Sequence, residues 1–313
     1  MGHRERWLSA DGQRTAAKVL RRLRWGRSLE GLGLPTVGGR LDLRGFALPE
    51  PDFTPVRAAG MTVEVASGKL PEFRKLRLRG VDLTGSRLRH LRLTDARLED
   101  CLLREADLTD LRAWRCWFDN CDLAGADITD AVLSARHRGA GTTWRNCSFE
   151  SPALDGISAE GAEFQGCAFE RVAMTSVVFD GCGFTDCRVT GSLVNVTFSG
   201  SNPPRGAKPA TMTNFDLRDC RLTDVDFMGL RLAGVLLPPQ ESVVVLPHAG
   251  KLLDAIRSAI AGNPEYRYLN FWVDYRIKHH EADDDLYLDY DEIRQNADER
   301  SVTLLREVIS RVS

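Results

Sequence analysis

The sequence lacks the features of a membrane-spanning or secreted protein. No stretch approaches the roughly 18–20 consecutive apolar residues that a transmembrane helix needs. The N-terminal segment is charged and has neither an apolar core nor a small-residue cleavage site, so it does not resemble a secretory signal. An excess of one charge is also missing: 42 Lys and Arg residues face 44 Asp and Glu residues, so no overall charge draws the chain to nucleic acid. We therefore expect a cytoplasmic protein without a membrane partner.

Catalytic motifs are missing as well. The sequence contains no G-x-S-x-G or H-E-x-x-H motif, and the segment 139–143 lacks the lysine of a phosphate-binding loop. His279 and His280 precede an acidic run at 283–285, but adjacent residues on a helix cannot both reach one metal ion. A solvated linker is favoured there, with a divalent-cation site as the alternative. We predict no enzymatic activity, no cofactor and no metal.

What the sequence does contain is a five-residue repeat. A large apolar residue recurs every five positions over 78–133, then over 144–189 in a register shifted by one residue, and again over 217–237. A period of five fits neither a helix, at 3.6, nor a flat strand, at 2. It fits a chain that turns a corner every five residues and closes a square coil every twenty. Stacked coils would pair backbone to backbone at about 4.8 Å, and each would rely on its neighbours for a core.

The repeated segments resemble a known family. ADLTD at 106–110, CDLAG at 121–125 and ADITD at 126–130 are similar to the pentapeptide-repeat motif A(D/N)Lxx. That family folds as a right-handed quadrilateral β-helix. The resemblance covers roughly 41–237, and it implies an all-β solenoid with an N-terminal helical cap and a C-terminal α-helical segment.

Three segments follow from the repeat and its ends. We expect a basic helical cap over 1–40, the β-helix over 41–240 and a C-terminal helical cap over 241–313. Register breaks are expected near 54–72, where the chain bulges out or forms a local strand pair, and near 134–143 and 199–214. The role of the loop 199–214 stays open.

The eight cysteines are predicted to belong to the core. Each stands two positions before a central apolar residue, and Cys147, Cys167 and Cys187 are twenty apart, so that they should stack. A buried free cysteine behaves as a small hydrophobe, and these spacings differ from the C-x2-C pattern of a zinc site. Reduced, buried thiols are therefore favoured over a metal site or disulfides. The predicted core includes Cys101, Cys121, Cys147, Cys167, Cys187, Phe164, Phe169 and Phe184.

The two ends differ in charge. Residues 1–40 carry nine basic and three acidic residues, and Ser9 can cap a helix that runs to about Trp25. This helix covers the first coil, or it also anchors an acidic partner. Residues 241–313 carry nine basic and fourteen acidic residues, and helices are expected over 248–261, 264–279 and 292–312.

Aromatic residues suggest an interface at the C-terminal end. All five tyrosines of the chain lie between positions 266 and 290, and tyrosine and tryptophan are enriched in protein interfaces. Some pentapeptide-repeat proteins dimerise end to end through C-terminal helices, so the resemblance implies a homodimer here, with a simple cap as the alternative. The candidate interface residues are Tyr268, Phe271, Trp272 and Tyr275.

Charged residues form columns on the predicted coils. Eight basic residues lie between positions 74 and 97 against two acidic ones, and a spacing of twenty would stack them. They are either a solvated mixed surface or a binding face for an anionic partner. The candidate basic face consists of Arg77, Arg87, Arg89, Arg92, Arg97 and Arg112. The candidate acidic face consists of Asp107, Asp110, Asp127 and Asp130.

These observations predict a non-catalytic scaffold that presents charged faces of a rigid rod to a protein partner. The alternative is implied by the resemblance: some family members mimic DNA, bind DNA gyrase or another topoisomerase and give quinolone-type resistance. Residues 41–240 hold 24 basic and 27 acidic residues, which is a weak polyanion. Direct binding of nucleic acid stays open, and the sequence does not identify the partner or pathway.

Overall fold

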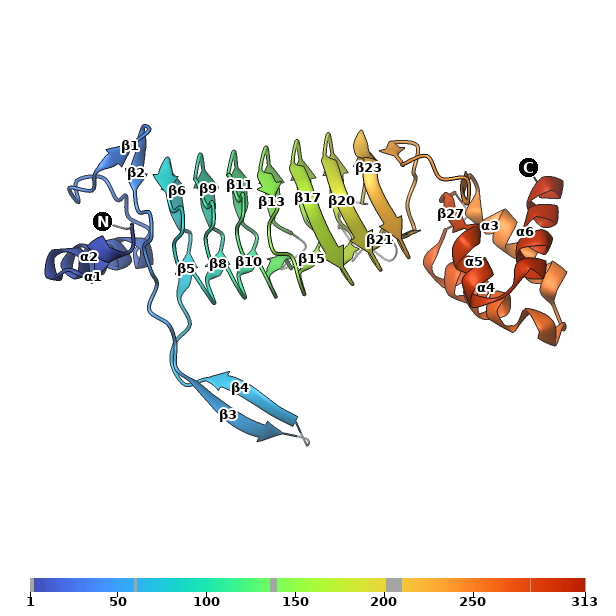
Figure 1. Ribbon diagram of the computed structural model, residues 1–313, viewed down its shortest axis with the longest axis horizontal. Helices are drawn as coiled ribbons and strands as arrows, with labels where there is room; N and C mark the ends of the chain where they lie inside the picture. Colours follow the sequence, from blue (N-terminus) through green and yellow to red (C-terminus); the bar gives the residue numbers. More distant parts are fainter. Residues whose placement is uncertain (1–2, 59–60, 136–139, 201–209, 282, 313) are drawn as a thin grey trace.

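The computed structural model describes residues 3–58, 61–135, 140–200, 210–281 and 283–312. Its central part is a rod of stacked coils, with helices at both ends and a hairpin that projects from one side (Figure 1). Arg77 pairs with Arg97, and Arg92 pairs with Arg112, so neighbouring coils lie twenty residues apart in parallel register. The stacked β-solenoid expected from the five-residue period is therefore confirmed.

Two of the four faces are continuous sheets of very short parallel strands. The first face contains β5 (Glu72–Arg74), β8 (Arg92–Thr94), β10 (Arg112–Trp114), β12 (Val132–Ser134), β15 (Ser158–Glu160), β18 (Val178–Asp180), β21 (Thr197–Ser199) and β24 (Asp226–Met228). The second contains β6 (Arg77–Arg79), β9 (Arg97–Glu99), β11 (Trp117–Asp119), β13 (Thr143–Arg145), β16 (Glu163–Gln165), β19 (Gly183–Thr185) and β22 (Met212–Thr213).

The other two faces are joined early by single bridges and later by longer strands. On the third face, single bridges connect Asp82, Leu102, Asp122 and Ser148. On the fourth, they connect Ala47, Arg87, Asp107, Asp127 and Ala153. The remaining strands of the rod are β1 (Thr36–Val37), β2 (Arg40–Asp42), β7 (Val81–Asp82), β14 (Ser148–Glu150), β17 (Ala168–Thr175), β20 (Arg188–Val194), β23 (Phe215–Thr223) and β25 (Val235–Leu236).

The corners explain why the repeat favours Asp, Asn and Gly. Corner residues such as Asp100, Asn120 and Asn146 have φ near +52°, in the left-handed region. Ten of the eighteen non-glycine residues with positive φ in the described part of the chain are Asp or Asn. These side chains tolerate left-handed backbone better than most others. The sequence thus encodes the turn as well as the core.

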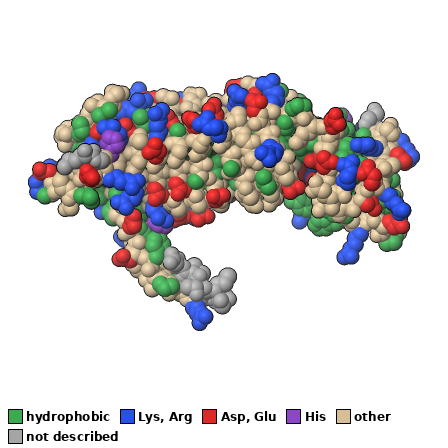
Figure 2. Space-filling view, viewed as in Figure 1, with side chains coloured by type: hydrophobic (Ala, Val, Ile, Leu, Met, Phe, Trp, Pro, Cys, Tyr) green, Lys and Arg blue, Asp and Glu red, His purple; other side chains and the backbone are tan. Residues whose placement is uncertain are grey.

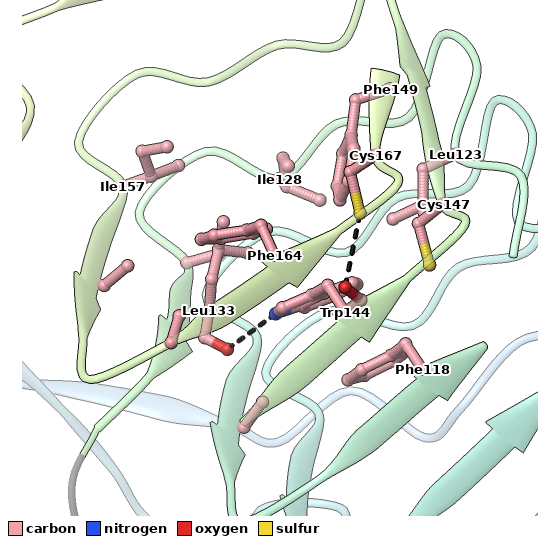
Figure 3. Packing of buried hydrophobic residues seen from close by; sticks show 14 of the residues in the cluster. Phe118, Leu123, Ile128, Leu133, Trp144, Cys147, Phe149, Ile157, Phe164 and Cys167 are labelled. Atoms are coloured by element: carbon pink, nitrogen blue, oxygen red, sulfur yellow. Dashed lines mark hydrogen bonds between the residues drawn. The ribbon is translucent and has the colours of Figure 1, made fainter. Parts of the chain in front are cut away.

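The core changes along the rod from leucine to aromatic rings. The rings of Phe118 and Trp144 stack with centroids 3.8 Å apart, and the Trp144 Nε1 donates a hydrogen bond to the Leu133 carbonyl at 3.2 Å (Figure 3). This column continues toward the C-terminal end, where Trp144 stacks on Phe164, and a second column of stacked rings runs beside it. The first continues through Phe184 and Phe215, and the second consists of Phe179, Phe198 and Phe227. Full burial of each such ring contributes about 1.5–3 kcal/mol.

All eight cysteines are buried and free. The thiol of Cys167 contacts the carbonyl of Trp144 at 3.3 Å, and that of Cys220 contacts the carbonyl of Val189 at 3.1 Å. Burial raises the pKa of the Cys116 thiol to about 11. A thiol with such a pKa is a poor nucleophile at neutral pH, because the thiolate is the reactive form.

We expect the native protein to resist thiol-reactive reagents. At pH 8 none of the eight cysteines should be labelled within the time that labels an introduced exposed cysteine, and all eight should react after denaturation. Val178→Cys supplies the control, because Val178 is 51% exposed on β18. Mass spectrometry of the labelled protein counts the modified thiols. Rapid labelling of Cys147, Cys167 or Cys187 in the native protein would contradict this packing.

The register shifts at several places, including the third expected break, across which Phe184 pairs with Met212, 28 positions later. Phe118 pairs with Trp144, 26 positions later, so the expected break at 134–143 adds six residues to one coil. A second, one-residue slip was not predicted from the sequence: Phe169 pairs with Val189, but Met174 pairs with Leu193, only 19 positions later. Gly191 lies at this slip with φ of +122°. The segment 201–209, within the third expected break, lies outside the described residues.

The break near 54–72 is a projecting hairpin. Strands β3 (Phe53–Ala58) and β4 (Met61–Ala66) pair in antiparallel fashion and extend away from the coils (Figure 1). At the N-terminal end, α1 (Glu5–Leu8) precedes α2 (Ala10–Arg24), and the Ser9 Oγ accepts a hydrogen bond from the backbone of Gly12 at 3.0 Å.

The C-terminal segment has a hydrophobic core of its own. It comprises α3 (Ala249–Ile260), the 3-10 turn η1 (Pro264–Tyr266), α4 (Arg267–His279), α5 (Tyr290–Asn296) and α6 (Glu299–Val312). The prediction of a single helix over 292–312 is wrong, because the helix is interrupted after α5. The Asp298 carboxylate then accepts a hydrogen bond from the backbone N–H of Ser301 at 2.8 Å and caps the start of α6. Strands β26 (Val243–Leu246) and β27 (Leu286–Asp289) form an antiparallel pair that was not predicted.

A buried ion pair joins this helical segment to the last coil. The guanidinium of Arg276 on α4, 3% exposed, pairs with the Asp226 carboxylate on β24. The Asp285 carboxylate accepts from the backbone of Leu232 at 2.7 Å, and the rings of Phe227 and Tyr287 lie 5.1 Å apart. The aromatic core of the rod thus continues into the helical segment.

Candidate interaction surfaces

Ion pairs between coils organise the charged surface. Because position i stacks near position i+20, an arginine reaches an acidic residue about one coil away. Arg104 contacts Asp122 at 2.6 Å and is eighteen positions before it, whereas Arg115 contacts Asp95 at 2.7 Å and is twenty positions after it. Such exposed pairs contribute modestly, about 0–1 kcal/mol each, but they hold the charged groups in fixed rows along the rod.

Asp110 is the centre of the densest group. Its carboxylate contacts the Nδ1 of His90 at 2.9 Å, Arg92 at 2.5 Å and Arg112 at 2.5 Å. Partial burial raises the pKa of this carboxyl, but the hydrogen bonds from Arg92 and His90 and the nearby guanidinium charges outweigh it, so the pKa lies below its ordinary value. The ionised form therefore stabilises the fold.

We expect Asp110→Asn to lower the free energy of unfolding by about 1.5–3 kcal/mol at pH 7, the range for hydrogen bonds to charged groups. The contribution is complete above the unfolded pKa of about 4 and is lost as pH falls through the lower folded value. The difference from the native chain should therefore shrink steadily as the pH falls below about 4. Urea unfolding at several pH values measures it. Asp11→Asn, which removes an exposed pair with Arg14, is the control and should change little at any pH.

The predicted basic residues do not share one face. Arg77 and Arg97 lie on the second face and Arg92 and Arg112 on the first, because the columns are set by strand position. Arg87 lies on the fourth face, bridged to Asp107. Arg89 follows it there and approaches Asp107 at 3.9 Å. The single basic face is therefore corrected to three separate columns.

Pairing reduces the free positive charge of these columns further. The Arg92 side chain is only 15% exposed beside Asp110, and Arg97 contacts Glu99 at 3.1 Å. Arg77 and Arg87 are exposed, and within the described residues neither has an acidic side-chain partner. These two arginines are the most available cations of the predicted set.

The predicted acidic residues divide in a similar way. Asp107 and Asp110 contact basic side chains, whereas Asp127 and Asp130 are exposed, and no ion pair of theirs occurs among the described residues. Asp155, exposed in the next coil, extends this group. Acidic side chains gather along the lower edge of the coils beside the hairpin (Figure 2). We call Asp127, Asp130 and Asp155 the acidic triplet.

Sequence reasoning also missed the buried charge of Asp42. Asp42, 3% exposed, accepts hydrogen bonds from Arg6 at 2.7 Å and from Arg44 at 3.0 Å. Burial raises the pKa of this carboxyl, but the hydrogen bonds from both guanidiniums outweigh it and hold the pKa well below its usual range. The group fixes α1 to the first coil. Arg6 and Asp42 are 36 positions apart in the sequence, so no local sequence pattern indicated that they would pair.

In the described segments, no three His, Cys, Asp or Glu side chains converge as a metal-binding group. No described helix is both long and apolar enough to cross a bilayer. His280 instead contacts the Arg276 carbonyl through Nδ1 at 3.0 Å, and its burial lowers its pKa.

Comparison with known families bears on the early coils. A family model described as pentapeptide repeats matches residues 72–110 in eight copies. These residues form β5 to β9 and the corners between them, in the parallel twenty-residue register described above. This part of the chain consists of pentapeptide repeats. None of the curated proteins compared with it matches.

Several solved structures are similar in part. A trypsin-treated form of QnrB1, a plasmid-mediated fluoroquinolone resistance protein, is 16% identical, covers 64% of this chain and 88% of its own, and has a TM-score of 0.28. HetL, a pentapeptide-repeat protein involved in heterocyst differentiation regulation in the cyanobacterium Nostoc, is 18% identical over 54% of this chain and 90% of its own, with a TM-score of 0.17. Rfr23 from the cyanobacterium Cyanothece is 14% identical over 63% and 87%, with a TM-score of 0.18.

The C-terminal helical segment exposes aromatic residues. Phe271 is 70% exposed and Tyr275 41% exposed on α4, with ring centroids 6.4 Å apart. The other two candidates differ. Trp272 is buried against Arg276, which corrects its assignment to an interface, and the Tyr268 hydroxyl contacts the Glu292 carboxylate at 3.1 Å. The exposed aromatic surface is therefore Phe271 and Tyr275.

Proposed function

We propose that this pentapeptide-repeat protein is a non-catalytic scaffold that presents charged faces of its rod to a protein partner. The observation that carries the proposal is the set of ion pairs between coils. They hold charged side chains in rows on a β-coil that cannot bend without breaking strand pairs. Fixed charges of this kind favour recognition because little conformational entropy is lost when a partner binds.

Charge-reversal variants test the scaffold. The full chain, immobilised, should retain partner proteins from cell extract in a salt-sensitive way, because exposed charges are screened at high ionic strength. Arg77→Glu with Arg87→Glu reverses the available cations, and Asp127→Lys with Asp130→Lys reverses the available anions. Lys251→Glu on α3 is the matched control. Partners that stay bound to both double variants and to 0.5 M salt would contradict recognition by the charged faces.

A homodimer through the C-terminal helices is part of this proposal. Phe271 and Tyr275 offer an apolar surface on an exposed helix face, and a second copy would cover it. We expect Phe271→Asp with Tyr275→Ser to halve the mass in solution measured by light scattering, whereas Val178→Asp, on the exposed surface of β18, should not. An equal mass for all three proteins would exclude this dimer interface.

Mimicry of DNA toward a topoisomerase is the alternative function. It requires a strongly acidic rod, whereas the acidic residues of the early coils alternate with arginines that contact them. A supercoiling and cleavage-complex assay with bacterial gyrase, with and without a fluoroquinolone, decides between the two. Inhibition of gyrase, or its protection from the drug, near stoichiometric amounts of this protein would make mimicry the function. No effect at large excess would exclude mimicry.

A further inference from the structure

Among the described residues, no further strand pairs with either edge of the β3–β4 hairpin. The backbone of Ser67 donates to the Asp52 carbonyl at 2.7 Å, so residues 52 and 67 form a hydrogen-bonded pair. Hydrogen-bonded and non-hydrogen-bonded pairs alternate along an antiparallel ladder. The register of the two strands then makes Pro55 and Glu64 a non-hydrogen-bonded pair, whose backbone groups point outward.

Proline makes the two edges unequal. The outward positions of β3 are 53, 55 and 57, and Pro55 has no N–H to offer at the middle of that edge. The outward positions of β4 are 62, 64 and 66, and all three have an N–H and a carbonyl. The β4 edge is therefore the one that can accept a further strand.

The hairpin also exposes apolar side chains on both of its surfaces. Phe53 is 38% exposed, Val56 43% and Val65 49%. Alternation along the strands places Phe53 on one surface and Val56 on the other. An isolated two-stranded hairpin is only marginally stable in water, and a third strand provides the missing pairing. A third strand bound to this hairpin would therefore stabilise it.

Charge indicates what kind of strand fits. At the base of the hairpin, the Phe53 ring lies 4.8 Å from the His90 ring, and His90 contacts Asp110. The acidic triplet lies in the coils that follow Asp110. Asp127 is on the fourth face, and Asp130 and Asp155 are at the corner where that face ends. In Figure 1, β4 is on the side of the hairpin toward the coils, and in Figure 2 acidic side chains line the edge of the coils there.

We propose that the β4 edge binds an extended, basic segment of a partner protein by strand addition. The partner's backbone pairs with residues 62, 64 and 66, and its Lys or Arg side chains face the acidic triplet. Backbone pairing supplies affinity in this mode, and side chains supply selectivity. The inference rests on the proposed scaffold function and names the partner chemistry for one of its surfaces.

The probe is the acetylated, amidated peptide KVKVTVKVKV, titrated into the full chain. Its matched controls carry Glu in place of each Lys, or N-methyl groups on alternate amides. We expect the basic peptide to bind and to slow hydrogen exchange of the amides of Thr62, Glu64 and Ala66 by at least about tenfold, as for newly bonded groups. The acidic peptide and the N-methylated peptide should bind at least about tenfold more weakly, a change of about 1.4 kcal/mol.

Two kinds of variant separate the edge from the charge. Glu64→Pro removes the central outward N–H of β4 and should weaken peptide binding at least about tenfold. Arg57→Pro, at an outward position of β3, is the matched control and should bind as the native chain does. Changing the acidic triplet to Asn should also weaken binding and flatten its dependence on salt.

The proposal is overturned if the basic peptide does not bind, if it protects β3 amides, or if the acidic peptide binds equally well. It is also overturned if the β4 amides of the free chain exchange slowly in a concentration-dependent way, because a second copy then occupies the edge. Loss of peptide binding with retained salt-sensitive capture of partners would reject this surface alone. Loss of both would reject the scaffold function.

Discussion

Replacing Phe164 with alanine is expected to lower the free energy of unfolding by about 3–5 kcal/mol, the range for a fully buried phenylalanine. Phe164 is 0% exposed and lies in the middle of the aromatic core. Its ring centroid is 5.0 Å from that of Phe184, 5.5 Å from Phe169 and 6.2 Å from Phe179. Alanine would leave a cavity and remove several ring contacts at once.

The effect should spread along the rod. In a solenoid each coil is stabilised mainly by its two neighbours, so a weakened coil can divide the rod into two cooperative units. Urea unfolding followed by circular dichroism should show a lower midpoint and a broader transition. Val178→Ala, at a position 51% exposed, is the control and should change stability by less than about 0.5 kcal/mol. A loss below about 1 kcal/mol for Phe164→Ala would contradict the packing of the core.

Replacing Gly191 with alanine is expected to destabilise the protein by at least about 3 kcal/mol, because the native backbone there is incompatible with a side chain. An added Cβ would lie 2.1 Å from the carbonyl oxygen of Val172 and 2.7 Å from its nitrogen. Both atoms are backbone, so no side chain can move aside. The φ of +122° adds strain for any L-residue other than glycine.

Gly80→Asn is the matched control. Gly80 has φ of +61°, and nothing lies within 4 Å of an added Cβ. Asn is tolerated in this left-handed region, and the next corners of the same column are Asp100 and Asn120, whose side chains bond to each other at 2.7 Å. Thermal unfolding should show a large drop in Tm for Gly191→Ala and little change for Gly80→Asn. Equal effects would show that positive φ alone, and not the close approach, sets the cost.

The repeated part of the fold was accessible from the sequence because each coil restates the same local rule. An inward apolar residue every five positions and Asp, Asn or Gly at many corners fix the turn and the core together, and parallel stacking follows. The shift at 134–143 could be predicted because the apolar series resumes at Trp144 in a new register. The slip at Gly191 was missed because only Leu193 and Phe198 continue the apolar series in the shifted register before the next interruption.

The candidate surfaces were less accessible. The residues of the basic columns could be predicted from the sequence. Whether each arginine is free to contact a partner depends on ion pairs about one coil away, such as that of Arg92 with Asp110. Trp272 and Phe271 are adjacent in sequence, yet one is buried and the other is 70% exposed. A helix places neighbouring residues about 100° apart, and only the packing of α4 on its neighbours decides which one faces water.

The sequence by itself determined the stacked coil, its inward thiols and aromatic rings, and the capping helix that begins after Ser9, because these depend on short-range periodicity. Only the tertiary structure decided which charges are neutralised, how Arg276 joins the helical segment to Asp226, and that the hairpin projects with its β4 edge open. Those features depend on which distant residues meet in space. A five-residue repeat fixes the distance between coils, but it leaves open what each coil meets at its surface.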